Sequence, residues 1–98
     1  MNPQIPSPIP LFDPGVCLIT PQAQLILSEA KQDPATYIRR HVCGDWSSMP
    51  NLAREQNLRA LDARDDILST YNVPGKGMVW VKTDRAAGVT TILLPSDY

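Results

Sequence analysis

The chain has 98 residues, of which 43% are hydrophobic and 19% are charged, and its formal net charge is -1. This size and composition fit one compact domain and leave no room for a second. The near-neutral charge argues against nucleic acid as a partner, because phosphate-binding surfaces normally carry a basic excess. No apolar run approaches the roughly 18 residues of a membrane span, and the first residues lack a signal-peptide pattern. We therefore expect a cytoplasmic protein that does not contact a membrane.

Prolines are concentrated at the start of the chain, with six of the ten in the first 21 residues. Because proline fixes φ and donates no backbone hydrogen bond, we expect residues 1–19 to form an extended arm and residues 20–98 to form a single domain. The arm carries four large apolar residues, Ile5, Ile9, Leu11 and Phe12. They are expected to pack on the chain's own domain, and the alternative is exchange with a partner or a second copy, which would give a homo-oligomer.

Three helices are predicted in the middle of the chain. Thr20-Pro21 is a start signal for a first helix over about residues 21–31, and Asp33-Pro34 is the same signal for a second, short helix that Gly44 can end. The third helix is predicted over residues 52–64. On its apolar face Asn57 would be a buried polar residue, and we expect it to hydrogen-bond the turn at residues 44–46.

Short β-favouring runs follow at residues 67–71, 78–83 and 89–94, separated by two turn-forming loops. This order predicts an α+β fold in which about three helices are followed by a three-stranded antiparallel β-meander. The expected core residues are Trp46, Leu61, Val79, Val81, Ile92, and Leu94 or its neighbour Leu93 on the other face. The last three residues are expected either to fold back, with Tyr98 near Arg85 or the arm, or to project as a docking tail.

The stretch RRHVCGDW at residues 39–46 contains the only histidine of the chain. A small hydrolase or nuclease could use His41 as a base, with Asp45 or Asp84 orienting it and Arg85 holding an anion, provided that these residues converge in space. The preferred interpretation is structural: His41 packs beside Tyr37 and Trp46 with one ring nitrogen bonded to backbone. Gly44 then ends the helix, Asp45 bonds backbone amides of the turn, and Trp46 fills the core.

No metal or cofactor is expected. A zinc site needs about four ligands in recurring pairs, whereas the chain has one histidine and two cysteines, Cys17 and Cys43, which we expect to be free thiols. The acidic run at residues 62–66 lacks the spacing of a calcium loop, and residues 74–77 lack the spacing of a phosphate-binding loop.

Several short motifs follow one another in a recognisable order: RH, two residues, GDW; then NLRAL, LSTY and VW; then DR, four residues, TTILLPSDY. This order resembles a family of small bacterial proteins often carried on plasmids and integrative elements, over most of residues 21–98. The resemblance implies a genomic setting and no established activity. We therefore expect a non-enzymatic accessory protein of a mobile element that binds another, unidentified protein, and the alternative is the small hydrolase or nuclease.

Overall fold

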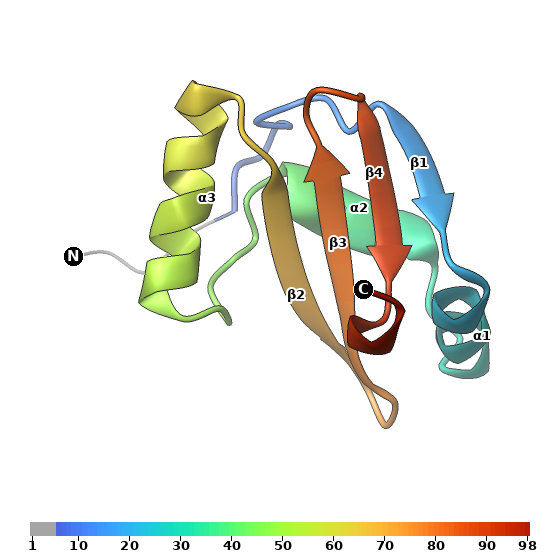
Figure 1. Cartoon of the computed structure of the whole chain (residues 1–98). Helices are drawn as coiled ribbons and strands as arrows, with labels where there is room; N and C mark the ends of the chain where they lie inside the picture. Colours follow the sequence, from blue (N-terminus) through green and yellow to red (C-terminus); the bar gives the residue numbers. More distant parts are fainter. Residues whose placement is uncertain (1–5) are drawn as a thin grey trace.

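A computed structural model describes residues 6–98 of the chain. Its elements in chain order are strand β1 (Val16–Ile19), helices α1 (Pro21–Glu29), α2 (Pro34–Val42) and α3 (Asn51–Ala63), strands β2 (Ile67–Val73), β3 (Gly77–Asp84) and β4 (Val89–Leu93), and a short 3-10 helix, η1 (Pro95–Asp97). The three helices and the last three strands lie close to their predicted bounds. The α+β class is therefore confirmed (Figure 1).

The sheet differs from the prediction, because it has four strands in the order β1-β4-β3-β2 and is mixed rather than a three-stranded antiparallel meander. Strands β2, β3 and β4 pair antiparallel, as expected. Strand β1 adds to them in parallel, with Val16 opposite Val89 and Ile19 opposite Ile92. The last residues of the expected arm therefore belong to the sheet.

Strand β1 was not predicted, although local sequence signals for it are present among the prolines of the arm. The run Val16–Ile19 is apolar and β-favouring, and it lies between turn signals at Pro14-Gly15 and Thr20-Pro21. Gly15 has φ of +66° and approaches Gly88 so closely that a Cβ atom would lie 2.0 Å from the Gly88 carbonyl oxygen. This approach places Val16 N–H 2.9 Å from the same oxygen, where the pairing with β4 begins.

The helix boundaries follow the predicted capping residues. The Thr20 hydroxyl accepts a hydrogen bond from Ala23 N–H at the start of α1, and the Asp33 carboxylate accepts one from Ala35 N–H at the start of α2. A proline follows each cap, where its missing N–H is not needed. Gly44, with φ of +72°, follows the end of α2. These caps explain why the bounds of α1 and α2 were predicted closely, whereas α3 begins after Pro50 without a side-chain cap.

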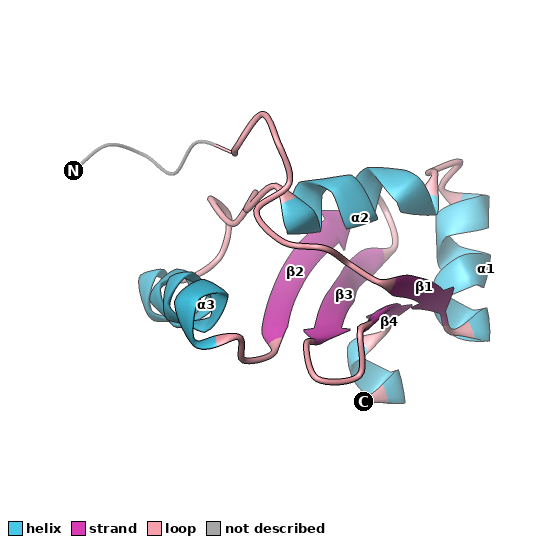
Figure 2. Ribbon diagram, turned by 90° about the horizontal axis from the view of Figure 1, so that it is seen from above, coloured by secondary structure: helices cyan, strands magenta, loops and turns pink. Residues whose placement is uncertain are grey.

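Helix α2 crosses one face of the sheet, α1 lies beside the end of β1, and η1 lies on the opposite side from α2 (Figure 2). Two clusters of buried side chains fill the covered side. The first contains Leu27, Tyr37, Tyr71, Val79, Val81 and Ile92, and the second contains Phe12, Trp46, Met49, Ala60 and Ile67. Of the predicted core residues, Trp46, Val79, Val81, Ile92 and Leu93 are buried, and Leu61 and Leu94 are partly buried against the clusters.

The opposite face of the sheet is more open. Val16, Leu18 and Met78 are among its exposed apolar side chains, and the partly buried Trp80 lies beside the ring of Tyr98, with 5.4 Å between ring centroids. The last residues thus fold back toward Trp80 and Lys82, rather than toward Arg85 or the arm. No helix within residues 6–98 is long and apolar enough to cross a membrane.

Candidate functional site

His41 lies at the centre of a buried chain of polar side chains between α2 and the sheet. Its Nδ1 is 2.5 Å from Ser69 Oγ and its Nε2 is 2.7 Å from Thr83 Oγ1. Trp46 Nε1 also donates to Ser69 Oγ, at 2.7 Å. On the other side Thr83 Oγ1 lies 2.6 Å from Thr90 Oγ1, which donates to the carbonyl oxygen of Pro14 at 2.7 Å. The chain thus connects the turn after α2 to the segment before β1.

The donor and acceptor of every hydrogen bond in this series of side chains follow from the groups at its two ends, the Pro14 carbonyl and the Trp46 N–H. The carbonyl of Pro14 can only accept, so Thr90 uses its single proton there and must accept from Thr83. Thr83 then accepts from His41, which is therefore protonated on Nε2. At the other end the Trp46 N–H can only donate, so Ser69 accepts from it and donates to the bare Nδ1. Each of the three hydroxyl groups therefore accepts one hydrogen bond and donates one.

Burial keeps the imidazole neutral. His41 is fully buried, and burial lowers its pKa from 6.5 to about 3. Its ring nitrogens bond side-chain hydroxyls, which corrects the expected backbone partner. The ring of Phe12 from the arm meets it edge-on, with 5.1 Å between centroids. Within residues 6–98 the imidazole is thus held by two hydroxyl groups and one aromatic ring, and it is closed off from solvent.

Asp45 is part of an ion pair next to α2. Its carboxylate accepts a hydrogen bond from Arg40 Nε at 2.6 Å, instead of bonding the backbone of the turn as expected. The Arg40 guanidinium also lies 4.3 Å from the ring centroid of Tyr71. The Tyr71 side chain is buried, and burial raises the pKa of its hydroxyl. This cluster joins α2 to β2.

Asp84 is the last residue of β3, and Arg85 begins the loop that leads to β4. The Asp84 carboxylate accepts a hydrogen bond from Ala87 N–H and so stabilises the turn. Arg85 donates to the Ala60 carbonyl at 3.4 Å, and its guanidinium lies 5.4 Å from the ring centroid of Phe12. The Phe12 ring thus contacts both Arg85 and His41. Each of the four candidates has its own local contacts, and they do not line one open pocket.

Asn57 was expected to bond the turn at residues 44–46, and that partner was wrong. Its Nδ2 donates to the Leu68 carbonyl at 2.8 Å, and its Oδ1 accepts from Leu68 N–H at 3.3 Å. The amide therefore pairs with the outer edge of β2 as a neighbouring strand would. The position of Asn57 on an apolar helix face correctly indicated a buried amide that needs hydrogen-bond partners, but the sequence could not identify Leu68 as the partner.

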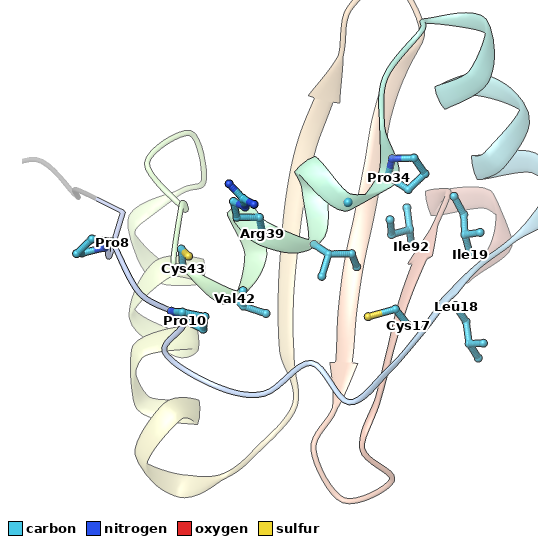
Figure 3. A pocket seen from close by; sticks show the side chains of 12 residues that line it. Pro8, Pro10, Cys17, Leu18, Ile19, Pro34, Arg39, Val42, Cys43 and Ile92 are labelled. Carbon is cyan, nitrogen blue, oxygen red and sulfur yellow. The ribbon is translucent and has the colours of Figure 1, made fainter.

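An open pocket of about 660 Å³ lies between β1, α2 and the arm (Figure 3). We call it the β1–α2 groove. Helix α2 and its C-cap contribute residues that are four apart in the sequence and therefore lie on one face of the helix. They are Pro34, Ala35, Ile38, Arg39, Val42 and Cys43. The remaining lining residues are Pro8 and Pro10 of the arm, Cys17, Leu18 and Ile19 of β1, and Ile92 of β4. Sequence reasoning missed this groove because it assigned β1 to the arm.

The arm forms one end of the β1–α2 groove because it is tied to the end of α2. Ser7 N–H donates to the Cys43 carbonyl and Leu11 N–H to the Val42 carbonyl, both at 2.7 Å, which satisfies carbonyls that a helix end leaves unpaired. Phe12 is buried, whereas Ile9 and Leu11 are exposed, and Ile5 lies outside the described residues. The arm thus docks on its own domain through these contacts.

The lining of the groove is apolar apart from Arg39 and two thiols. Cys17 and Cys43 are both free, as expected, and both line the groove. Within residues 6–98 there is no group of three or more histidine, cysteine or acidic residues that could hold a metal ion. Pockets of this volume lie in the range of roughly 300–1,000 Å³ that is typical of ligand sites. The groove can therefore receive an apolar ligand or side chains of a partner.

Comparison with known proteins finds no matching family model, no matching curated protein and no matching solved structure. The geometry described above is therefore the basis for a functional proposal.

Proposed function

We propose that this protein is a non-enzymatic accessory protein that acts by binding another protein, and that the β1–α2 groove receives the partner. The observation that carries this proposal is an exposed apolar groove with a single charged lining residue, Arg39, within the described part of the chain. Apolar concave surfaces of this kind are typical of binding sites in proteins. The sequence resemblance supplies the proposed genomic setting, a bacterial mobile element, and the proposed location is the cytoplasm because the sequence lacks a signal-peptide pattern.

A small hydrolase or nuclease has less support. Such an enzyme needs a base that its substrate can reach, and His41 is fully buried between α2 and the sheet. Lys82 lies on the other face of the sheet, where it donates to the Tyr98 hydroxyl at 3.3 Å. Asp84 and Arg85 are engaged in local contacts, so none of these groups converges on the imidazole.

Affinity capture from the native host tests the binding proposal when it includes two matched variants. Ala35→Glu places a carboxylate in the groove, whereas Leu58→Glu places one at an exposed position of α3 outside it. We expect the native chain and Leu58→Glu to capture the same partner and Ala35→Glu to lose it. Thermal melts of both variants confirm that they are folded. Equal capture by Ala35→Glu would contradict the groove as the binding site.

The enzyme alternative has its own test. The native chain and His41→Gln are assayed with general esterase, phosphodiester and single-stranded nucleic acid substrates, at a temperature at which both remain folded. We expect no turnover from either protein. Turnover by the native chain that His41→Gln abolishes would contradict a non-enzymatic function.

A further inference from the structure

The two edges of the sheet differ in how far their backbone groups are covered. At one edge, Asn57 pairs with both backbone groups of Leu68, so part of β2 is covered. At the other edge, β4 is the only strand beside β1 within residues 6–98. Strand β1 has only four residues, of which Val16, Cys17 and Leu18 are exposed and Ile19 is half-buried, and it includes no charge, proline or bulge that would prevent a free edge from pairing. Strand β1 is thus an edge that remains able to accept another strand.

The unpaired backbone groups of β1 can be identified from its pairing with β4. Val16 N–H donates to Gly88 and Thr20 N–H donates to Ile92, so residues at this spacing face β4. In a parallel ladder the intervening residues face away from the partner. The N–H and C=O groups of Cys17 and Ile19 therefore point outward, and within residues 6–98 no other segment bonds them.

This same edge is a wall of the β1–α2 groove. Cys17, Leu18 and Ile19 are consecutive, and successive side chains of a strand point to opposite faces. Three consecutive residues can line one groove only if the backbone edge itself borders it. A strand added beside β1 would therefore place every second side chain in the apolar groove and the others in solvent.

Charge limits what this added strand can be. Arg39 is the one charged residue among the described residues that line the groove, and it is exposed in the last turn of α2. An occupant that carries a carboxylate beside Arg39 would be complementary to it. The residues of β1 itself have no carboxylate, so β1 of a second copy would leave Arg39 without this complement.

On the basis of the proposed function, we propose that the partner contributes an extended segment that pairs with the free edge of β1. Its side chains that face α2 are apolar at alternate positions and include a carboxylate that pairs with Arg39. Main-chain hydrogen bonds to Cys17 and Ile19 supply affinity, and the groove supplies specificity.

A defined peptide tests this inference with the full chain labelled for NMR. The probe is acetyl-Thr-Val-Thr-Leu-Thr-Asp-amide, in which valine, leucine and aspartate share one side of an extended strand. We expect its titration to shift the amide signals of Cys17, Ile19 and Arg39, and to leave those of α3 unchanged. N-methylation of the peptide amides that face β1 should abolish binding, because it removes the donors without removing the apolar side chains.

Charge reversal tests the contact with Arg39. We expect Arg39→Glu to weaken binding of the aspartate peptide roughly fivefold and to favour a peptide with lysine in its place. Arg59→Glu, at an exposed position of α3, is the matched control and should bind as the native chain does. Rescue of Arg39→Glu by the lysine peptide would identify the ion pair directly.

Three results would overturn the inference. They are binding of the N-methylated peptide as tight as that of the parent, shifts confined to another surface, and no shift at any amide at millimolar peptide. A dimer detected by light scattering and lost in Leu18→Lys would assign the edge to a second copy instead. Each of these results leaves the binding proposal standing if Ala35→Glu still loses the captured partner, so the two proposals fail separately.

Discussion

His41 Nε2 donates to Thr83 Oγ1 at 2.7 Å, and this contact joins two elements that are 42 residues apart in the sequence. It fixes the tautomer of a neutral imidazole between α2 and β3. The hydroxyls of Ser69 and Thr83 are both buried, so loss of the imidazole would leave two polar groups without partners. This relationship connects the sequence motif around His41 to stability.

The buried imidazole predicts a pH-dependent stability. The pKa of folded His41 is about 3 and that of an unfolded histidine is about 6.5, so the unfolded chain binds the proton first as the pH falls. The stabilisation is complete above about pH 6.5 and declines toward pH 3, by on the order of 4–5 kcal/mol in all. Denaturant unfolding of the native chain and of His41→Gln across this range measures it. The same slope in both proteins would contradict the prediction.

Trp46→Ala should destabilise the domain by about 3–5 kcal/mol, the range for loss of a large buried aromatic side chain. The residue is fully buried, and its indole N–H also donates to Ser69. Leu52→Ala is the control, because Leu52 is 64% exposed, and it should change stability by less than about 0.5 kcal/mol. Urea unfolding followed by circular dichroism gives both values. Equal effects would show that Trp46 does not support the core.

Two glycines form a matched pair. Gly15 and Gly75 both have positive φ, at +66° and +72°, so alanine at either position costs about 1–2 kcal/mol in backbone strain. A Cβ atom at Gly15 would also collide with the backbone of Gly88, whereas one at Gly75 would meet nothing within 4 Å. We expect Gly15→Ala to destabilise the protein by at least about 2 kcal/mol more than Gly75→Ala. Thermal melts that fall equally for the two variants would contradict this close approach.

Asn57→Ala should destabilise the protein by about 1–3 kcal/mol, since it removes both hydrogen bonds to the Leu68 backbone. Hydrogen exchange at the Leu68 amide should become faster, while the amides of β3 keep their protection. Gln56→Ala, at the adjacent exposed position, serves as the control. Unchanged exchange at Leu68 would show that Asn57 does not protect this edge.

Asp97 and Tyr98 should contribute unequally to the stability of the protein. Asp97 accepts hydrogen bonds from the Thr20 hydroxyl at 2.7 Å and from Leu94 N–H at 3.0 Å, whereas Tyr98 is 72% exposed. We expect deletion of Tyr98 alone to change the melting temperature little and to expose Trp80 to a fluorescence quencher. Deletion of both residues should lower the melting temperature further, because Thr20 also caps α1. Equal melts for the two deletions would contradict a role for Asp97.

The hydrogen bonds to Asp97 lower the pKa of its carboxyl group. Its contribution to stability is therefore present at neutral pH and is lost as the pH falls through the folded pKa. Deletion of both residues should remove that part of the acid sensitivity, and deletion of Tyr98 alone should retain it. Melting temperatures measured from pH 7 to pH 2 compare the two.

Local signals were sufficient for much of the fold. Thr20-Pro21, Asp33-Pro34 and Gly44 act on residues within one helical turn, so their roles could be predicted from sequence. The pairing of Val16–Ile19 with β4 depends on a contact across nearly the whole chain, which no local pattern specifies. The proline count around β1 favoured the wrong interpretation.

The candidate site was less predictable for a similar reason. The pattern around His41 identified a histidine worth testing, and its burial beside Trp46 was anticipated. Its partners Ser69 and Thr83 are ordinary strand residues, and only the register of the sheet brings them to the imidazole. The β1–α2 groove could not be foreseen once β1 had been assigned to the arm.

The hydrogen bond from Thr90 to Pro14 spans 76 residues of sequence. This contact can form only when the intervening loop has closed, and closure of a long loop costs conformational entropy. During synthesis, β1 must therefore wait for β4 to leave the ribosome, and until then its apolar residues have no strand to pair with. Among the strands of residues 6–98, β1 is thus made before β4, and it joins the sheet only when β4 is available.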